Sequence, residues 1–293
     1  MIVLHNMGGA RSEKELKEFL FNMFMDKRII SSPIRFALAP LISNLRYKRV
    51  WKNYEKIGGS RIYDITQNLA KKVENITGEK TAYAFRYTKP HIKDVVVEKD
   101  IILVPLYPHY SFTTYESSID ELKESKLNAK VIKPFYKHPE YNEIIKKNIL
   151  KSIENPKEWN LIFSAHGLPE KIIKKGDNYK NEVEEHIQIL KNILPEFKSI
   201  SLAFQSRFGP GEWLKPYLDK ELKKYKNEKV LIYPISFVID NSETDLELKV
   251  EYGHLAKEIG IKEYKVVECP NDSDEMAKFI VELINESGYT KSH

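Results

Sequence analysis

Cysteine is almost absent from this 293-residue chain, which contains only Cys269. A single thiol excludes a disulfide framework, and it excludes a zinc or iron–sulfur site whose cysteine ligands all come from this chain. A chain of this length buries roughly 75% of its unfolded surface and needs no such cross-link to hold a core. We therefore expect an ordinary hydrophobic core, in keeping with 42% hydrophobic residues.

Long apolar runs and a strong charge of one sign are missing as well. No window reaches about 18 consecutive apolar residues, so we expect no membrane-spanning helix. The chain opens on the apolar residues Met1–Leu4, so we expect no signal peptide. Lysine and arginine number 47 against 42 aspartates and glutamates, a net charge of +5 that does not indicate a nucleic-acid partner. We expect a cytoplasmic protein.

Common nucleotide-binding and hydrolase motifs are absent too. The chain contains neither G-x-G-x-x-G nor G-x-x-x-x-G-K-[ST], which argues against a dinucleotide or P-loop site. G-x-S-x-G is missing, so a serine hydrolase built on Ser164 is only a minor alternative.

Short β-branched runs alternate with amphipathic stretches along the whole chain. This alternation is typical of βαβ units and predicts an α/β protein with mostly parallel, doubly wound sheets. The expected strands are Ile2–His5, Thr81–Arg86, Ile101–Pro105, Ala129–Lys133, Leu161–Ser164, Ser199–Phe204, Val230–Tyr233 and Tyr264–Val267. The expected helices include Ser12–Met25, Ile62–Glu74, Tyr141–Ile153, Glu182–Ile193, Glu243–Ala256 and Asp274–Ile284.

The best domain boundary lies at Lys137-His138-Pro139, just before a helical stretch. We expect two similar doubly wound lobes, 1–140 and 141–271, with an active-site cleft between them. In such sheets ligands bind outside the carboxyl ends of the strands, so candidate site residues are sought there.

A histidine follows one of the expected central strands. The apolar run Leu161–Phe163 leads into Ser164-Ala165-His166-Gly167-Leu168-Pro169, which places His166 at the carboxyl end of that strand. A single histidine is usually structural. One that interrupts an apolar run at this position is about equally expected to be an acid–base group or a metal ligand.

Glu243, Glu247 and Glu251 recur every four residues, which predicts three carboxylates on one helix face. Asp240 and Glu243 also fit a capping box, and acidic residues at a helix N-terminus need no further function. Like charges at this spacing repel one another, however, and Glu251 lies too far from the N-terminus to be compensated. The spacing therefore slightly favours a bound cation or a proton path.

Aromatic residues gather after another expected strand, in Leu106–Thr114, where they suit either a core or the wall of a pocket for a flat ligand. Two glycine pairs, in Asn6-Met7-Gly8-Gly9 and Ile57-Gly58-Gly59-Ser60, are most simply tight turns.

These segments together resemble the ferrochelatases, lyases that insert ferrous iron into a porphyrin at the end of haem synthesis. The resemblance covers nearly the whole chain in the family's motif order. It implies a two-lobed chelatase fold whose C-terminal segment, 272–293, packs back onto the first lobe. It also implies porphyrin and Fe²⁺ as substrates, no tightly bound cofactor and no iron–sulfur cluster. The matching segments are Asn6–Gly9, Ile57–Ser60, Phe85–Tyr87, Pro105–Ser111, Phe163–Pro169, Gln205–Pro210 and Phe237–Thr244.

The same motifs assign residues to roles. His166 and Glu243 correspond to the family's active-site pair and to its candidate metal ligands. Glu247, Glu251 and Asp240 correspond to acids of its proton or metal pathway. The porphyrin-binding positions are matched by Met7, Arg86, Tyr87, Tyr107, Ser111, Trp213 and Phe237.

Some positions depart from the family's pattern. Ser60-Arg61 replaces the usual third glycine or Ser-Pro, and Asn241 stands where many members carry histidine. Met7 resembles members that use protoporphyrin IX, whereas members that use coproporphyrin tend to carry tyrosine there.

The helical stretch Ser32–Tyr47 resembles the apolar lip of the family's pocket. Its apolar residues are flanked by basic ones, which predicts peripheral contact with the inner membrane face through 33–49. An ordinary buried helix is the alternative. The apolar residues are Phe36, Leu38, Leu41 and Ile42, and the basic ones are Arg35, Arg46, Lys48 and Arg49.

The chemistry of metal insertion suits these residue types. A neutral imidazole accepts a pyrrole proton near neutral pH, crowded carboxylates carry protons, and both bind ferrous iron loosely enough to release it. Insertion into a free-base porphyrin releases two protons. Two alternatives remain at this stage: a cobalt or nickel tetrapyrrole chelatase, and a non-catalytic haem- or porphyrin-binding protein that would not need the line of carboxylates.

Overall fold

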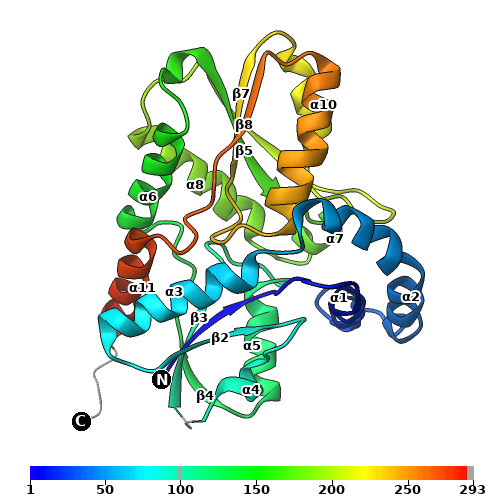
Figure 1. The fold of residues 1–293 in the computed structure, drawn as a ribbon, viewed down its shortest axis with the longest axis vertical. Coiled ribbons are helices and arrows are strands. Elements are labelled where there is room, and N and C mark those ends of the chain that lie inside the picture. The colour runs from blue at the N-terminus through cyan, green and yellow to red at the C-terminus, as the bar shows by residue number, and fades with distance from the viewer. Residues whose placement is uncertain (98–99, 289–293) are drawn as a thin grey trace. The chain divides into compact units, whose positions relative to one another are not determined.

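The computed structural model describes residues 1–97 and 100–288, which form two compact units (Figure 1). The first unit contains residues 1–107 and 111–134, together with 271–288 of the described C-terminal segment. The second contains residues 108–110 and 135–270. Each unit holds one four-stranded sheet.

In the first unit the strands lie in the order β2-β1-β3-β4 and all neighbouring pairs are parallel. These strands are β1 (Ile2–Asn6), β2 (Thr81–Phe85), β3 (Asp100–Pro105) and β4 (Asn128–Val131). The helices are α1 (Glu13–Met25), α2 (Arg35–Tyr54), α3 (Ile62–Thr77), α4 (Ile92–Val95), α5 (Tyr115–Glu124) and α11 (Asp274–Glu286).

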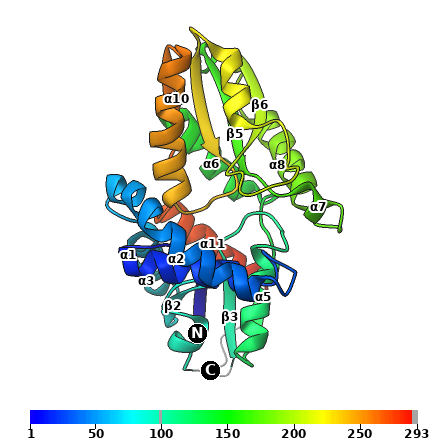
Figure 2. The same ribbon diagram turned by 90° about the vertical axis from the view of Figure 1, so that its right-hand side faces the viewer.

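In the second unit the strand order is β6-β5-β7-β8, and every neighbouring pair is again parallel. These strands are β5 (Trp159–His166), β6 (Ser199–Gln205), β7 (Lys229–Pro234) and β8 (Glu263–Val266). The helices are α6 (Pro139–Lys151), α7 (Glu170–Ile173), α8 (Tyr179–Ile193), α9 (Leu218–Glu221), a π-helix (Glu243–Glu251) and α10 (Tyr252–Ile259). Figure 2 shows α8 and α10 on opposite sides of this sheet.

The two sheets have the same topology, because β5 to β8 repeat the arrangement of β1 to β4. This confirms the prediction of two similar doubly wound α/β lobes. In such an order the chain turns in opposite directions after the two central strands, so a crevice forms between their carboxyl ends. In the second unit those strands are β5 and β7, which end at His166 and Pro234.

Hydrophobic packing explains why these segments are strands. Leu161, Ile162 and Phe163 of β5 are fully buried, because helices cover both faces of a parallel sheet. One face packs Ile162 against Val230, Ile232 and residues of the helices that follow β7, among them Leu248. The first unit has a comparable core around Val3 and Leu103. A sheet held in this way fixes the positions of the side chains at its ends.

The C-terminal helix α11 belongs to the first unit and packs against α3 (Figure 1). Ser273 caps it by accepting a hydrogen bond from the Met276 N–H, and Lys72 of α3 forms an ion pair of 2.7 Å with Asp274. The described part of the segment 272–293 belongs to the first unit, and residues 289–293 lie outside the described residues.

Candidate active site

The imidazole of His166 lies at the carboxyl end of β5, beside the segments that follow β6 and β7. In the sheet register His166 lies opposite Gln205 of β6, and Ser164 lies opposite Pro234 of β7. The His166 N–H donates to the Ser236 hydroxyl at 3.0 Å, which ties the strand end to the segment after β7. The Phe237 ring meets the imidazole edge to face, with centroids 6.4 Å apart. Strand register and this hydrogen bond fix the backbone of His166 at the strand end.

Glu243 lies directly against this histidine. The His166 Nδ1 atom is 2.6 Å from the Glu243 Oε2 atom, and the side chains are 35% and 21% exposed. A contact this short between partly buried groups is a charge-assisted hydrogen bond. It favours the tautomer that carries its proton on Nδ1, which leaves the Nε2 lone pair to accept a proton or to bind a metal.

Glu247 lies on the next turn and is held by Gln205, the last residue of β6, and by Ser206, which follows it. The Ser206 N–H donates to Glu247 Oε1 at 2.8 Å, and the Gln205 side-chain amide donates to Oε2 at 3.2 Å. The Ser206 hydroxyl contacts Glu247 Oε2 and also lies 3.2 Å from Glu243 Oε2. Ser206 therefore joins the two carboxylates into one cluster with His166.

Burial and mutual charge set the protonation of the three groups. Burial works against a charge on His166, but the adjacent Glu243 carboxylate raises its pKa above the ordinary value. Burial also works against a charge on Glu243, and the neighbouring His166 charge lowers the pKa of Glu243 nevertheless. Burial, followed by the charge of Glu243, raises the pKa of Glu247 to about 7. Glu247 can therefore take up and release protons at neutral pH.

The helix that carries these acids is a π-helix over Glu243–Glu251, and it continues as α10. The sequence predicted a regular helix here, and the wider turn with its i→i+5 hydrogen bonds is a correction. Such turns are rare and occur often at functional sites. Exposure increases along the line of acids: Glu243 and Glu247 are half-buried, and Glu251 is exposed.

The capping box of Asp240 and Glu243 does not form. The Asn241 side chain accepts from the Glu243 N–H at 2.8 Å, and the Asn241 N–H donates to the Thr244 hydroxyl at 2.9 Å. Asp240 is fully buried and accepts from the Cys269 N–H. The Glu243 carboxylate is therefore directed to His166 rather than to the helix end, and Asn241 takes the capping role.

Gly167 directly follows β5, and Trp213 lies close to it in the second unit. Trp213 is buried, and its backbone pairs with Pro169 in an isolated antiparallel bridge. Among the described residues, the Trp213 Nε1 atom has no hydrogen-bond partner. A side-chain Cβ at Gly167 would come within 2.6 Å of the Gln205 carbonyl oxygen, so glycine is required at that position.

The residues expected to bind porphyrin in the first unit follow its two central strands. Met7 comes directly after β1 and is half-buried, and its N–H donates to the Asn6 side chain at 2.8 Å. Tyr107 and Ser111 follow β3 and are buried, with the Ser111 hydroxyl 3.0 Å from that of Thr113. These residues lie at the carboxyl ends of β1 and β3, which is the ligand-binding position in a sheet of this order.

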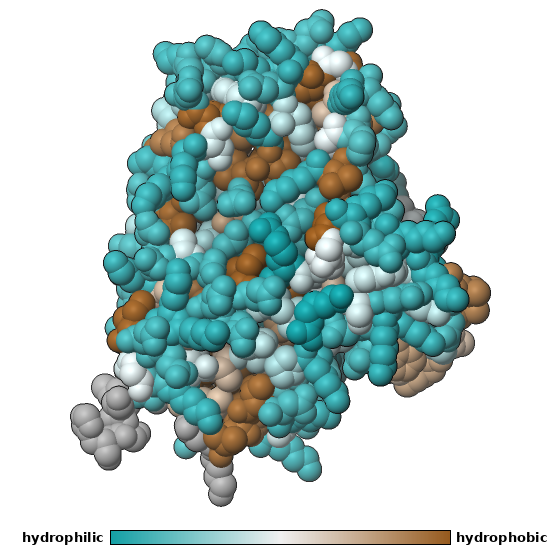
Figure 3. All heavy atoms as spheres, viewed as in Figure 1, coloured by the Kyte–Doolittle hydropathy of each residue, from teal (hydrophilic) through white to brown (hydrophobic). Residues whose placement is uncertain are grey.

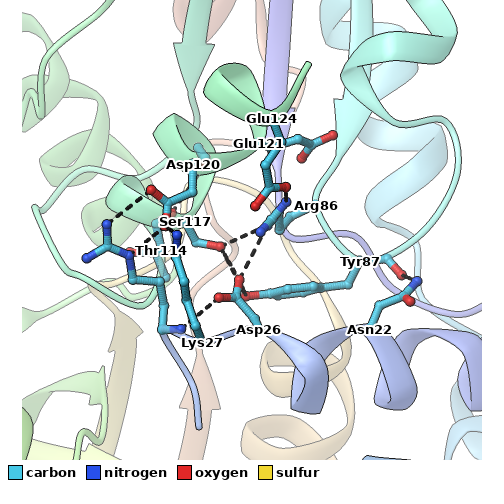
Figure 4. A network of polar contacts seen from close by, with 12 residues as sticks. Asn22, Asp26, Lys27, Arg86, Tyr87, Thr114, Ser117, Asp120, Glu121 and Glu124 are labelled. Carbon is cyan, nitrogen blue, oxygen red and sulfur yellow. Dashed lines mark hydrogen bonds and ion pairs between the residues drawn. The ribbon is translucent and has the colours of Figure 1, made fainter. Parts of the chain in front are cut away.

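Arg86 and Tyr87 come at the end of β2 and meet a buried carboxylate, Asp26 (Figure 4). The Tyr87 hydroxyl and the Arg86 Nε atom donate to Asp26 Oδ2 at 3.1 and 3.3 Å, and Ser117 donates to the same oxygen. Arg86 also binds Glu124 at 2.9 Å. Burial opposes the charge of Arg86, and its acidic partners still raise its pKa above the ordinary value. Both predicted porphyrin-binding side chains therefore have internal partners, and their ligand role stays a prediction.

Sequence analysis did not assign Gln205, Ser206, Ser236 or Tyr179, although all four belong to the surroundings of His166. Ser236 accepts from the His166 N–H, and its hydroxyl lies 2.6 Å from that of Tyr179. Their position directly after β6 and β7 was the available signal, since Gln205-Ser206 already formed part of a recognised segment. Tyr179 carried no comparable signal.

The fold defines the class of this protein. Its structure is similar to SirB from Bacillus subtilis (TM-score 0.58, 12% identity, 98% of this chain and 94% of that chain). It is also similar to CbiX, the terminal enzyme for biosynthesis of siroheme in denitrifying bacteria (TM-score 0.57, 12% identity, 97% of each chain). The architecture is that of the chelatases.

Sequence comparison then gives the family within that class. The family model for ferrochelatase matches residues 1–288. The ferrochelatase of Campylobacter concisus is 47% identical over 96% of both chains. That of Nitratiruptor sp. is 43% identical over 96% of this chain and 98% of its own. The chain belongs to the ferrochelatase family, and it is therefore a metal chelatase, a lyase of haem biosynthesis whose substrates are a porphyrin and iron.

Proposed function

We propose that the protein inserts Fe²⁺ into protoporphyrin IX and releases two protons, with His166 as the group that accepts pyrrole protons. The observation that carries this proposal is the short contact between His166 and Glu243. A carboxylate on Nδ1 orients the imidazole and stabilises its protonated form, which makes Nε2 a better base. The raised pKa of His166 agrees with this role.

Protons leave the site along the carboxylates of Glu243, Glu247 and Glu251. Glu243 is innermost because it contacts His166, Glu247 follows through Ser206, and Glu251 is exposed. A pKa of about 7 allows Glu247 to pass protons in both directions at neutral pH. Asp240 is buried against Cys269, so we place it outside this path as a support for the segment before the π-helix.

Iron reaches the porphyrin through the same residues. The His166 imidazole and the Glu243 carboxylate suit Fe²⁺ as nitrogen and oxygen donors. We expect no tightly bound cofactor and no iron–sulfur cluster. Cys269, the only cysteine, is buried, and burial raises the pKa of its thiol well above the ordinary value.

We favour protoporphyrin IX over coproporphyrin as the substrate because of the side chain at position 7. Met7 directly follows β1, at the carboxyl end of the sheet. A thioether is apolar and adaptable and suits the apolar edge of protoporphyrin. The test is anaerobic metal insertion with each porphyrin, followed by absorption spectroscopy, in the wild-type protein and in Met7→Tyr. We expect a higher kcat/KM with protoporphyrin IX and a shift toward coproporphyrin III in the variant. A wild-type preference for coproporphyrin would contradict this assignment.

Peripheral membrane contact is the second part of the proposal, and α2 carries it. Its exposed apolar residues form a protruding patch, which Figure 3 shows at the right of the view. Leu41 and Leu45 are 54% and 71% exposed, and Arg46, Lys48 and Arg49 are exposed beside them. An apolar face with basic neighbours suits an anionic lipid surface. Within residues 1–97 and 100–288, no helix has the length and apolar composition needed to cross a bilayer.

Two details of the predicted lip need correction. Leu38 and Ile42 are half-buried rather than exposed, on a helix that packs against α1. Ile34 and Leu45 take their place on the exposed side, with Phe36 and Leu41.

A further inference from the structure

Ser206 contacts both inner carboxylates of the site, Glu243 and Glu247. It follows the last residue of β6, and its backbone has φ = +64°. This is the left-handed region, which residues other than glycine rarely adopt. Its N–H donates to Glu247 Oε1 at 2.8 Å, and its hydroxyl reaches Glu247 Oε2. The same hydroxyl is 3.2 Å from Glu243 Oε2.

The unusual backbone angle has a visible consequence. It turns the N–H and the side chain of Ser206 toward the same carboxylate, so that each Glu247 oxygen meets a Ser206 donor. Gln205 adds a third donor, and its own amide oxygen accepts from Ser164 of β5 at 2.6 Å. Backbone conformations of this kind persist where the surrounding structure requires them, often at functional sites.

A carboxylate pair needs such a device. Glu243 and Glu247 lie one turn apart, and the charge of Glu243 contributes to the raised pKa of Glu247. The Ser206 hydroxyl has one proton and two lone pairs, so it donates to one ionised carboxylate at a time. When Glu247 is protonated, its carboxyl can donate to the hydroxyl while the hydroxyl donates to Glu243, and the two oxygens are then bridged.

We propose that Ser206 is a positioning residue for metal insertion, which holds the Glu247 carboxylate next to the His166–Glu243 pair. This inference rests on the proposed function. Ser206 acts through Glu247, and its left-handed backbone and its hydroxyl are both needed. A purely structural role in the turn after β6 would require only the backbone angle, which glycine provides better than serine.

The variants Ser206→Gly and Ser206→Ala distinguish the positioning role of Ser206 from a purely structural role in the turn. Glycine removes the hydroxyl and relieves the backbone, whereas alanine removes the hydroxyl and keeps the unfavourable angle. We expect both variants to lower kcat for Fe²⁺ insertion about tenfold or more, because each loses the bridging donor. The porphyrin KM should stay nearly unchanged. Thermal stability should be retained in Ser206→Gly and reduced in Ser206→Ala, so that activity does not follow stability. Ser201→Ala, on the same strand β6, is the matched control and should keep wild-type kcat.

A double-variant cycle tests the route through Glu247. If Ser206 acts by placing that carboxylate, Ser206→Gly should change kcat by less than about threefold in a Glu247→Gln background. Additive losses, or a fully active Ser206→Gly protein, would overturn the inference while leaving the proposed function intact. A wild-type protein that inserts no iron would overturn the proposed function itself, and the inference with it.

Discussion

At the scale of single residues, one short contact determines the properties of the site. The 2.6 Å separation of His166 Nδ1 and Glu243 Oε2 raises the pKa of the histidine and lowers that of the glutamate. Burial, and after it the charge of Glu243, raises the pKa of the next acid, Glu247, to about 7. The surroundings thus give the three groups different pKa values, which suits the roles proposed above: His166 as the base, and Glu243 and Glu247 as successive members of the proton path.

The line of glutamates should show graded effects on turnover. We expect Glu243→Gln to lower kcat about 100-fold or more, Glu247→Gln less and Glu251→Gln least, because water replaces an exposed carrier more easily than a buried one. The measurement is kcat and melting temperature for the three variants. Equal small losses of kcat, or a Glu243→Gln loss that accompanies a lower melting temperature, would contradict the proton path. The glutamates would then be ordinary solvated surface charges.

A second buried group of histidines gives stability a pH dependence. His109 Nε2 lies 2.9 Å from His186 Nδ1, and His186 Nε2 lies 2.9 Å from the Asn142 amide oxygen. Burial lowers the pKa of His186 to about 3, and burial with the neighbouring imidazole lowers that of His109. In the unfolded chain a histidine titrates near 6.5, so between pH 6.5 and 3 the unfolded state binds more protons.

Stability should therefore fall as the pH drops below 6.5, by roughly 1.4 kcal/mol per pH unit for each such histidine at most. His186→Gln should show a shallower fall than the wild type in denaturant unfolding at pH 5 to 7. His254→Gln, at an exposed position on α10, serves as the control and should keep the wild-type slope. If the stability of His186→Gln had the same dependence on pH as that of the wild type, His186 would not be a neutral, buried histidine in the folded protein.

At the scale of elements, the sequence predicted the strands well and the detail of one helix poorly. The apolar run before His166 predicted β5 because a strand buried on both faces must be apolar throughout. The four-residue spacing of the glutamates predicted a shared face but could not distinguish i→i+4 from i→i+5 hydrogen bonding. The left-handed Ser206 was not predictable, because serine carries no preference for that conformation. The sequence also did not predict that Arg86 and Tyr87 share Asp26 as a partner, because Asp26 follows α1 and lies far from both along the chain.

The exposed face of α2 leads to a prediction about membranes. The wild-type protein should float with vesicles that contain anionic lipid, and Leu41→Asp with Leu45→Asp should abolish flotation because both side chains are exposed. Ile76→Asp, at an exposed apolar position on α3, is the matched control and should bind as the wild type does. Failure of the wild type to bind, or binding that the α2 variants do not change, would remove this proposal.

At the scale of the whole molecule, two sheets of one topology carry candidate site residues at equivalent strand ends. The second unit places His166, Glu243 and Glu247 at the ends of β5 to β7, and the first places Met7, Tyr107 and Ser111 after β1 and β3. The repeated pattern of strands in the sequence predicted this duplication. Assigning the reacting groups to one unit required the contacts themselves, since spacing left His166 equally compatible with a structural role.

The central claim is that His166, oriented by Glu243, is essential for metal insertion and not for porphyrin binding. The most direct measurement is anaerobic insertion of Fe²⁺ by His166→Ala beside the wild type, with porphyrin binding followed in parallel by absorption titration. We expect the variant to bind protoporphyrin IX with nearly wild-type affinity and to form no detectable haem. A variant that kept more than about a tenth of wild-type kcat, a loss below about 1.4 kcal/mol, would contradict the claim.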